Sequence, residues 1–244
     1  MADNAPALRL GSIAPNFKAL TTQGEIDFHE FIGNNWTILF SHPADFTPVC
    51  TTELGAFARL QDEFDQRGVK MIGLASSYHL LMGNYMTALA NTLLLVQSAN
   101  DLSSHDDWIK DINEVGSTQV KFPIIADADR KVAFLYQMID QLDLENVDSK
   151  GIAFTIRSVF IIDPTKKIRL IMAYPASTGR NTAEILRVVD SLQTGDKKGV
   201  TTPVNWLPND DVIIPPTVST EDAKKKFGEI REVKPYLRFT TLKE

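Results

Sequence analysis

Short apolar runs rich in β-branched residues alternate along this chain with amphipathic stretches of helical period. The runs that predict strands cover residues 36–41, 69–75, 122–126, 154–162 and 168–172. A helical period relates Leu54, Phe57, Leu60 and Phe64, on a helix that we expect to end near Gly68, and it returns over residues 182–192. This alternation predicts an α/β domain with a central mixed β-sheet flanked by helices.

A turn separates the last two predicted strands. Its residues are Asp163-Pro164-Thr165-Lys166, in which proline presets one backbone dihedral and aspartate can bond the backbone amides that follow. We therefore expect an antiparallel hairpin at one edge of the sheet.

The composition of the chain changes after Leu192. Glycine, proline and short strand-like pieces follow, then a predicted helix over residues 221–227 and a last apolar run over 236–241. We therefore expect a main domain over residues 1–192 and a small C-terminal α+β domain over 193–244. A unit of that size seldom supports its own core, so we expect it to pack on the main domain or on a second subunit.

Composition narrows the possible functions. The chain has 244 residues, 43% of them hydrophobic, and its 25 basic and 31 acidic side chains leave a net charge of −6 without a basic patch. This argues against nucleic-acid binding. Residues 1–15 contain one arginine and no apolar run, so we predict no targeting segment and a cytoplasmic protein. A single cysteine excludes an intramolecular disulfide.

The cysteine lies in a setting that favours reactivity. Thr47-Pro48 is a helix-start signal, because threonine caps free amides and proline suits the first helical position. Cys50 would then be the third helical residue, where unpartnered N–H groups and the helix dipole stabilise a thiolate.

A helix N-terminus alone stabilises a thiolate by less than is needed to ionise most of it near neutral pH. Lowering a thiol pKa by about two units from about 8.5 takes roughly 2.7 kcal/mol. A helix N-terminus contributes up to about 2 kcal/mol. We therefore expect a cation beside Cys50. On these grounds alone, the alternative that Cys50 is a small buried hydrophobe stays open.

The pattern P-x-x-x-T-x-x-C after a strand, formed by Pro43, Thr47 and Cys50, resembles the active-site signature of the peroxiredoxins. The resemblance covers most of the chain and is that of the 1-Cys branch, of the peroxiredoxin-6 type. It is carried by residues 40–43, 51–54, 105–108, 122–124, 174–181, 202–206 and 236–238. It implies a thioredoxin-like fold and a thiol-dependent peroxidase that reduces hydrogen peroxide and organic hydroperoxides without a cofactor or metal.

The resemblance also implies roles for individual residues. Cys50 would be the peroxidatic nucleophile that becomes a sulfenic acid, Thr47 would hydrogen-bond the peroxide, and Pro43 would shield the sulfur from water. Arg157 matches the arginine that faces the thiolate, and so supplies the expected cation. The alternative for Arg157 is a surface arginine on a strand.

Three further residues have supporting roles by the same resemblance. Glu53 matches the residue that orients Arg157, and Arg180 matches a second arginine; both are otherwise ordinary surface charges. His42 adjoins the signature and would bond the thiolate or a buried carbonyl, or serve the structure alone.

A lone cysteine requires a partner from another molecule. The sulfenic acid returns to the thiol only through an external reductant, for which glutathione with a glutathione transferase, thioredoxin and ascorbate stay open. The resemblance implies a homodimer whose C-terminal unit reaches toward the partner's active site. A redox relay or a holdase chaperone on the same fold remains an alternative.

Mammalian relatives of this branch carry a phospholipase site with a serine, a histidine and an aspartate. Here Asn35 replaces the serine and Thr165 the aspartate, and only His29 matches. We expect no phospholipase activity.

Residues 71–100 contain no Asp, Glu, Lys or Arg. Polar residues interrupt the segment and no basic cluster flanks it, so we favour a packed or loosely attached helix over a membrane span. About twenty residues near 75–97 are extra relative to the family. They are a genuine surface insertion with an apolar interaction helix, or the product of a retained intron or faulty gene prediction.

Overall fold

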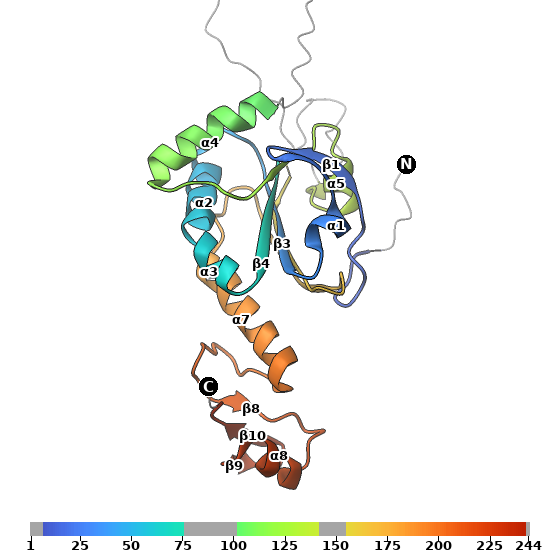
Figure 1. The fold of residues 1–244 in the computed structure, drawn as a ribbon, viewed down its shortest axis with the longest axis vertical. Coiled ribbons are helices and arrows are strands. Elements are labelled where there is room, and N and C mark those ends of the chain that lie inside the picture. The colour runs from blue at the N-terminus through green and yellow to red at the C-terminus, as the bar shows by residue number, and fades with distance from the viewer. Residues whose placement is uncertain (1–6, 76–101, 142–154, 243–244) are drawn as a thin grey trace, which may run out of the picture. The chain divides into compact units, whose positions relative to one another are not determined.

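The computed structural model describes residues 7–75, 102–141 and 155–242, which belong to two compact units, Met1–Arg180 and Asn181–Glu244. The first is an α/β unit and the second a smaller α+β unit (Figure 1). The boundary expected at residues 192 and 193 lies inside helix α7 (Thr182–Lys198), all of which groups with the second unit.

A seven-stranded mixed sheet forms the centre of the first unit, with the strand order β2-β1-β5-β4-β3-β6-β7. Strands β3, β4 and β5 are parallel, and β1, β2, β6 and β7 join antiparallel to their neighbours. The strands are β1 (Lys18–Thr21), β2 (Gly24–Asp27), β3 (Trp36–His42), β4 (Val69–Ala75), β5 (Ile124–Ala126), β6 (Arg157–Ile162) and β7 (Ile168–Tyr174). The predicted mixed sheet is confirmed.

The predicted hairpin is also confirmed, since β6 and β7 pair antiparallel and β7 is the outer strand. The strand predicted from residue 122 begins two residues later, at Ile124. Pro123 has no N–H to give to a ladder, and its carbonyl accepts from Gly73 N at 2.9 Å. The strand predicted over 154–162 begins at Arg157, and residue 154 lies outside the described residues.

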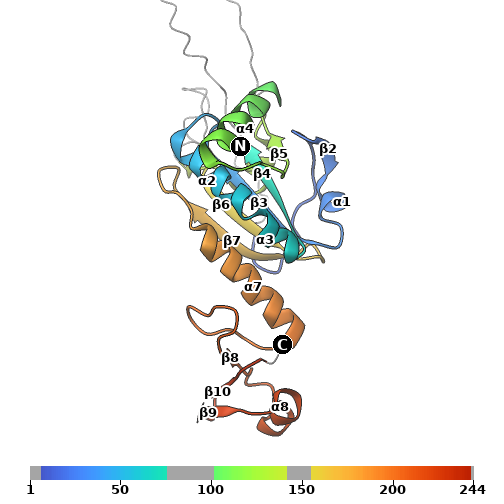
Figure 2. The same ribbon diagram turned by 60° about the vertical axis from the view of Figure 1, so that its left-hand side comes forward.

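Helices cover both faces of the sheet. On one side lie α2 (Pro48–Arg59), α3 (Gln61–Gln66) and α4 (Leu102–Gly116), and on the other lie α1 (Phe28–Ile32) and α5 (Lys131–Leu135) (Figures 1 and 2). The single helix predicted through Phe64 is two helices, because Leu60 leaves the helical conformation at φ −93° and ψ 6°. The predicted apolar face survives this break, with Leu54, Phe57 and Phe64 fully buried.

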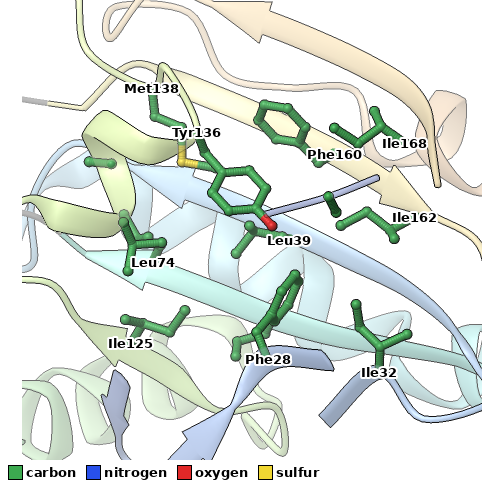
Figure 3. Packing of buried hydrophobic residues seen from close by; sticks show 14 residues of the cluster. Phe28, Ile32, Leu39, Leu74, Ile125, Tyr136, Met138, Phe160, Ile162 and Ile168 are labelled. Atoms are coloured by element: carbon green, nitrogen blue, oxygen red, sulfur yellow. The ribbon is translucent and has the colours of Figure 1, made fainter. Parts of the chain in front are cut away.

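Side chains of the central strand β3 pack against the helices on both faces of the sheet. Leu39 belongs to the core that contains Phe28, Tyr136 and Phe160, seen in Figure 3. Phe40, the next residue, stacks on Phe57 of α2 with ring centroids 4.4 Å apart. Since neighbouring side chains of a strand point to opposite faces, a strand buried on both faces is apolar throughout. This explains the apolar run over residues 38–40 in the middle of β3.

The second unit begins with α7. Asn181 caps it by accepting from the amides of Ala183 and Glu184, and Gly199 ends it at φ 66°. An antiparallel sheet of three strands follows, with helix α8 (Thr220–Phe227). Its strands, in spatial order, are β8 (Val212–Ile213), β10 (Leu237–Thr240) and β9 (Arg231–Lys234). The small α+β unit expected at the C-terminus is present.

The apolar stretch near 75–97 lies outside the described residues from residue 76 onward. Among the helices that the structure describes, none is both long and apolar enough to span a bilayer.

Candidate active site

Cys50 lies where the sequence predicts it, at the third position of α2 and directly beyond the loop that follows β3. Its side chain is fully buried. Thr47 is the N-cap residue, but the expected cap by its side chain is wrong. Its hydroxyl donates instead to Ala44 O, within the loop, at 2.9 Å. The first-turn amides near the sulfur are therefore not capped by Thr47.

Arg157 begins β6, the strand beside β3, and brings its guanidinium to the sulfur. Its Nη1 lies 3.2 Å from Cys50 Sγ. Nε and Nη2 both donate to the carbonyl of Ala176, at 2.9 and 2.7 Å, which orients the planar group. Arg157 is buried, so it is not the surface arginine of the alternative reading.

Glu53 lies one turn along α2 from Cys50 and binds both arginines. Its Oε2 accepts from Arg157 Nη1 at 2.6 Å and from Arg180 Nη2 at 2.9 Å. Burial opposes the charged carboxylate, yet the guanidinium and hydrogen bonds of Arg180, with the charge of Arg157, hold the pKa of Glu53 below its ordinary value. Neither Glu53 nor Arg180 is an ordinary surface charge.

The two arginines and Glu53 do not balance in charge within this buried cluster. Arg157 and Arg180 carry two positive charges and Glu53 carries one negative charge, so a protonated Cys50 would leave one positive charge uncompensated. An uncompensated charge is costly in a buried site, and a thiolate cancels it. Arg157 is therefore the cation that we expected beside Cys50.

His42 does not take either of the bonds expected for it, since its ring pairs with Asp45. The Nε2 of His42 lies 3.0 Å from Asp45 Oδ1, and His105 Nδ1 bonds the other carboxylate oxygen. Both imidazoles are fully buried. Burial lowers the pKa of His42, although Asp45 opposes the shift.

Sequence reasoning missed Asp45 and His105 as members of the site. Both lie in segments through which the chain resembles its family, but no local pattern pairs two residues 60 positions apart. Pro43 is buried in the same loop, as its expected shielding role requires. The structure thus gathers all seven predicted site residues at one end of β3 and β6.

No group of three or more His, Cys, Asp or Glu side chains that could hold a metal occurs among the described residues. The residues that would matter for a phospholipase are engaged elsewhere. His29 Nε2 bonds Ala14 O at 2.8 Å, Asn35 bonds Ile32 O, and Thr165 bonds the carboxylate of Asp163.

The chain matches two family models. One is that of the AhpC/TSA family, over residues 10–171, and the other is the C-terminal domain of 1-Cys peroxiredoxin, over residues 191–229.

Curated relatives match over nearly the whole chain. Peroxiredoxin PRX1, mitochondrial, from Saccharomyces cerevisiae is 54% identical over 98% of this chain and 82% of its own length. Human peroxiredoxin-6 is 45% identical over 96% of this chain and 97% of its own.

Solved structures agree. The yeast mitochondrial 1-Cys peroxiredoxin, studied for thiol resolution via glutathione/thioredoxin systems, has a TM-score of 0.79 at 51% identity, covering 96% of this chain and 99% of its own. A cysteine-to-serine mutant of peroxiredoxin 6 from Arenicola marina has a TM-score of 0.82 at 39% identity, covering 98% of this chain and 100% of its own. The thioredoxin-like fold is confirmed.

The expectation of a cytoplasmic protein is wrong as drawn, because a relative 54% identical over nearly the full chain is mitochondrial. That expectation rested on the composition of residues 1–15 and on the single cysteine, which fits any reducing compartment. The fold, the lone cysteine and both family matches converge on one conclusion: the chain belongs to the 1-Cys peroxiredoxins of the AhpC/TSA family, which are thiol-dependent peroxidases.

Proposed function

We propose that Cys50 is the peroxidatic nucleophile of this peroxidase and that Arg157 is its catalytic cation. One observation carries the assignment: the buried sulfur lies 3.2 Å from Nη1 of a buried arginine that two other groups hold in place. A cysteine that served only as a core residue would not need a guanidinium beside it.

The reaction is an in-line displacement. The Cys50 thiolate attacks the terminal oxygen of the hydroperoxide, an S–O bond forms, and the O–O bond breaks. The leaving alkoxide or hydroxide takes a proton and departs as alcohol or water, which leaves Cys50 as a sulfenic acid. Arg157 and the uncapped first-turn amides of α2 stabilise the negative charge that moves from sulfur to oxygen.

Thr47 has a defined part in this scheme. Its hydroxyl proton already points to Ala44 O, so its oxygen is left as an acceptor. It therefore accepts the O–H of the incoming hydroperoxide and aims the terminal oxygen at sulfur. Pro43, buried in the same loop, keeps water from the thiolate.

Reduction uses a thiol from outside the chain, since Cys50 is the lone cysteine. That thiol attacks the sulfenic sulfur and releases water, forming a mixed disulfide. A second thiol then frees Cys50. The glutathione/thioredoxin systems of the yeast 1-Cys peroxiredoxin make glutathione, with or without a transferase, and thioredoxin the first reductants to consider.

We further propose a homodimer, and a functional boundary near residue 193 between the peroxidase domain and the C-terminal domain. The family model for the C-terminal domain begins at residue 191, which supports the second point. Sedimentation of the reduced protein tests the dimer.

Steady-state peroxide consumption tests the reductant. Glutathione alone, glutathione with a glutathione transferase, thioredoxin with its reductase, and ascorbate are supplied in turn to the wild type and to Cys50→Ser. Turnover with a thiol system in the wild type alone supports the proposal. Equal turnover in Cys50→Ser overturns it.

A further inference from the structure

Asp45 is a buried carboxylate that the proposed chemistry does not use. It lies in the loop between β3 and α2, between Pro43 and Thr47, and is 5% exposed. Its two oxygens are shared between His42, at the end of β3, and His105, on α4. The Asp45 side chain thus links the loop to strand β3 and to helix α4.

This arrangement is costly unless both imidazoles serve as donors. A buried carboxylate needs hydrogen bonds, and here they hold the pKa of Asp45 at about 2 against the opposing effect of burial. Each histidine then donates from one ring nitrogen. The other nitrogens, His42 Nδ1 and His105 Nε2, are buried without a hydrogen-bond partner among the described residues.

Phe46, the residue after Asp45, has a backbone conformation that its surroundings must enforce. Phe46 has φ 53°, in the left-handed region that a bulky side chain rarely adopts. Such a conformation costs of order 1–3 kcal/mol and persists only where its surroundings enforce it. Phe46 is 40% exposed, and its ring lies beside that of Trp108, with centroids 6.4 Å apart. The anchor at Asp45 lies next to this strained link, and Thr47 follows it.

Helix α4 holds the start of α2 as well. Trp108, one turn after His105, donates from Nε1 to Thr51 Oγ1 at 3.0 Å. The Thr51 hydroxyl in turn donates to the carbonyl of Thr47 at 2.8 Å. The Thr47 backbone is therefore fixed from the helix side, while Asp45 fixes the loop side.

We propose that Asp45 is a positioning residue of the peroxidase site: held by His42 and His105, it keeps the Thr47 hydroxyl in the place where it meets the peroxide. The inference rests on the proposed function, because it assigns Asp45 to the loop that binds peroxide. Ionisation of Cys50 depends instead on Arg157 and the helix terminus. The proposal therefore predicts that loss of Asp45 slows the reaction of Cys50 with peroxide but not its reaction with other electrophiles.

Asp45→Ala tests this separation in single-turnover experiments on the full chain. The rate constant for oxidation of Cys50 by hydrogen peroxide is measured by tryptophan fluorescence, and the rate of alkylation by iodoacetamide by mass spectrometry. Iodoacetamide reports ionisation and access but does not use Thr47. We expect oxidation to slow by about 10²-fold, the loss that a misplacement of about 1 Å in a reacting group can cause. Alkylation should not slow.

Asp163→Ala is the matched control. Asp163 is 6% exposed and accepts hydrogen bonds from Thr165 and Lys167, but it follows the end of β6 remote from Arg157. We expect this variant to lose stability and keep the oxidation rate. If the oxidation rates of both variants fall in proportion to their loss of unfolding free energy, Asp45 is merely structural and the proposal is overturned.

His105→Asn and His105→Leu provide a second test that holds even if Asp45→Ala does not fold. The asparagine amide can occupy the place of Nδ1 and donate to Asp45, whereas leucine cannot. We expect rapid oxidation in the asparagine variant and slow oxidation in the leucine variant. Equal rates in the two variants overturn the proposal. A wild type that does not react with peroxide refutes the proposed function itself, whereas a wild type and an Asp45→Ala that react equally refute only this inference.

Discussion

Arg180 and Glu53 are joined at three points: the backbone amide and Nε of Arg180 donate to Oε1 at 2.7 and 3.0 Å, and Nη2 donates to Oε2 at 2.9 Å. The remaining Nη1 of Arg180 donates to the carbonyls of Ser41 and Ser158, at 2.8 and 3.0 Å. Arg180 therefore ties α2, through Glu53, to strands β3 and β6. The same carboxylate also accepts from Arg157, the arginine that faces the Cys50 sulfur.

Glu53→Gln should destabilise the fold and slow the enzyme without protonating Cys50. Removing one partner of a buried charge cluster costs about 3–5 kcal/mol, because the two guanidinium groups then lose the carboxylate charge between them. The surplus positive charge keeps the thiolate favoured, while Arg157 loses its 2.6 Å contact. Denaturant unfolding, thiolate absorbance and the oxidation rate measure the three effects. Loss of the thiolate band at neutral pH would contradict the charge argument.

Arg157→Ala should slow oxidation of Cys50 by about 10²–10³-fold, the usual loss when one preorganised donor to developing charge is removed. The thiolate fraction should fall as well, since the surplus positive charge disappears. Rapid mixing with hydrogen peroxide measures the rate.

Arg169→Ala is the control for Arg157→Ala. Arg169 is another arginine of the sheet, and it pairs with Asp163 at 3.2 Å. It should keep the wild-type rate. A similar loss of rate in both variants would refute a specific role for Arg157.

Cys50→Ser should abolish peroxide consumption, because a serine hydroxyl is not ionised at neutral pH and no second thiol exists in the chain. In the wild type without reductant, repeated peroxide addition should convert Cys50 to sulfinic acid, visible as two added oxygen atoms in the intact mass. Protection of an aggregating client by Cys50→Ser would reveal a chaperone function separate from the peroxidase.

Acidification should destabilise the protein from about pH 6.5 downward through His42. Burial lowers the pKa of His42 in the folded state below the ordinary value of about 6.5 that holds in the unfolded chain. Between those two values the unfolded chain binds more protons, so the free energy of unfolding falls as pH falls. His42→Gln retains a donor for Asp45 without titrating. Its stability should therefore depend less on pH than that of the wild type in urea unfolding, and parallel curves would contradict this assignment.

Phospholipid vesicles incubated with the pure protein should release no fatty acid. Asn35 has no hydroxyl to act as a nucleophile, and His29 is bonded to a backbone carbonyl at 2.8 Å. Chromatography of the extracted lipid is the measurement. Fatty-acid release at a rate above that of a heat-denatured sample would show that a different set of residues forms a lipase site.

Much of the site was predictable because its chemistry is local. The Thr47-Pro48 helix start places Cys50 in the first turn of α2, and the magnitude of the helix effect already required a cation. The identity of that cation came from the resemblance and not from pattern, since nothing in the residues around Arg157 distinguishes it from another strand arginine. The break at Leu60 escaped prediction because the apolar face continues across it.

By itself, the sequence determined the alternation of strands and helices, the position of Cys50 and the need for an external thiol. These depend on properties of neighbouring residues or on a count. Only the tertiary structure decided that Glu53 bridges two arginines, that the Thr47 hydroxyl turns toward Ala44, and that Asp45 lies between His42 and His105. The Thr47 bond depends on how the loop folds back on itself, while the contacts of Glu53 and Asp45 join separate elements, and burial makes these strong.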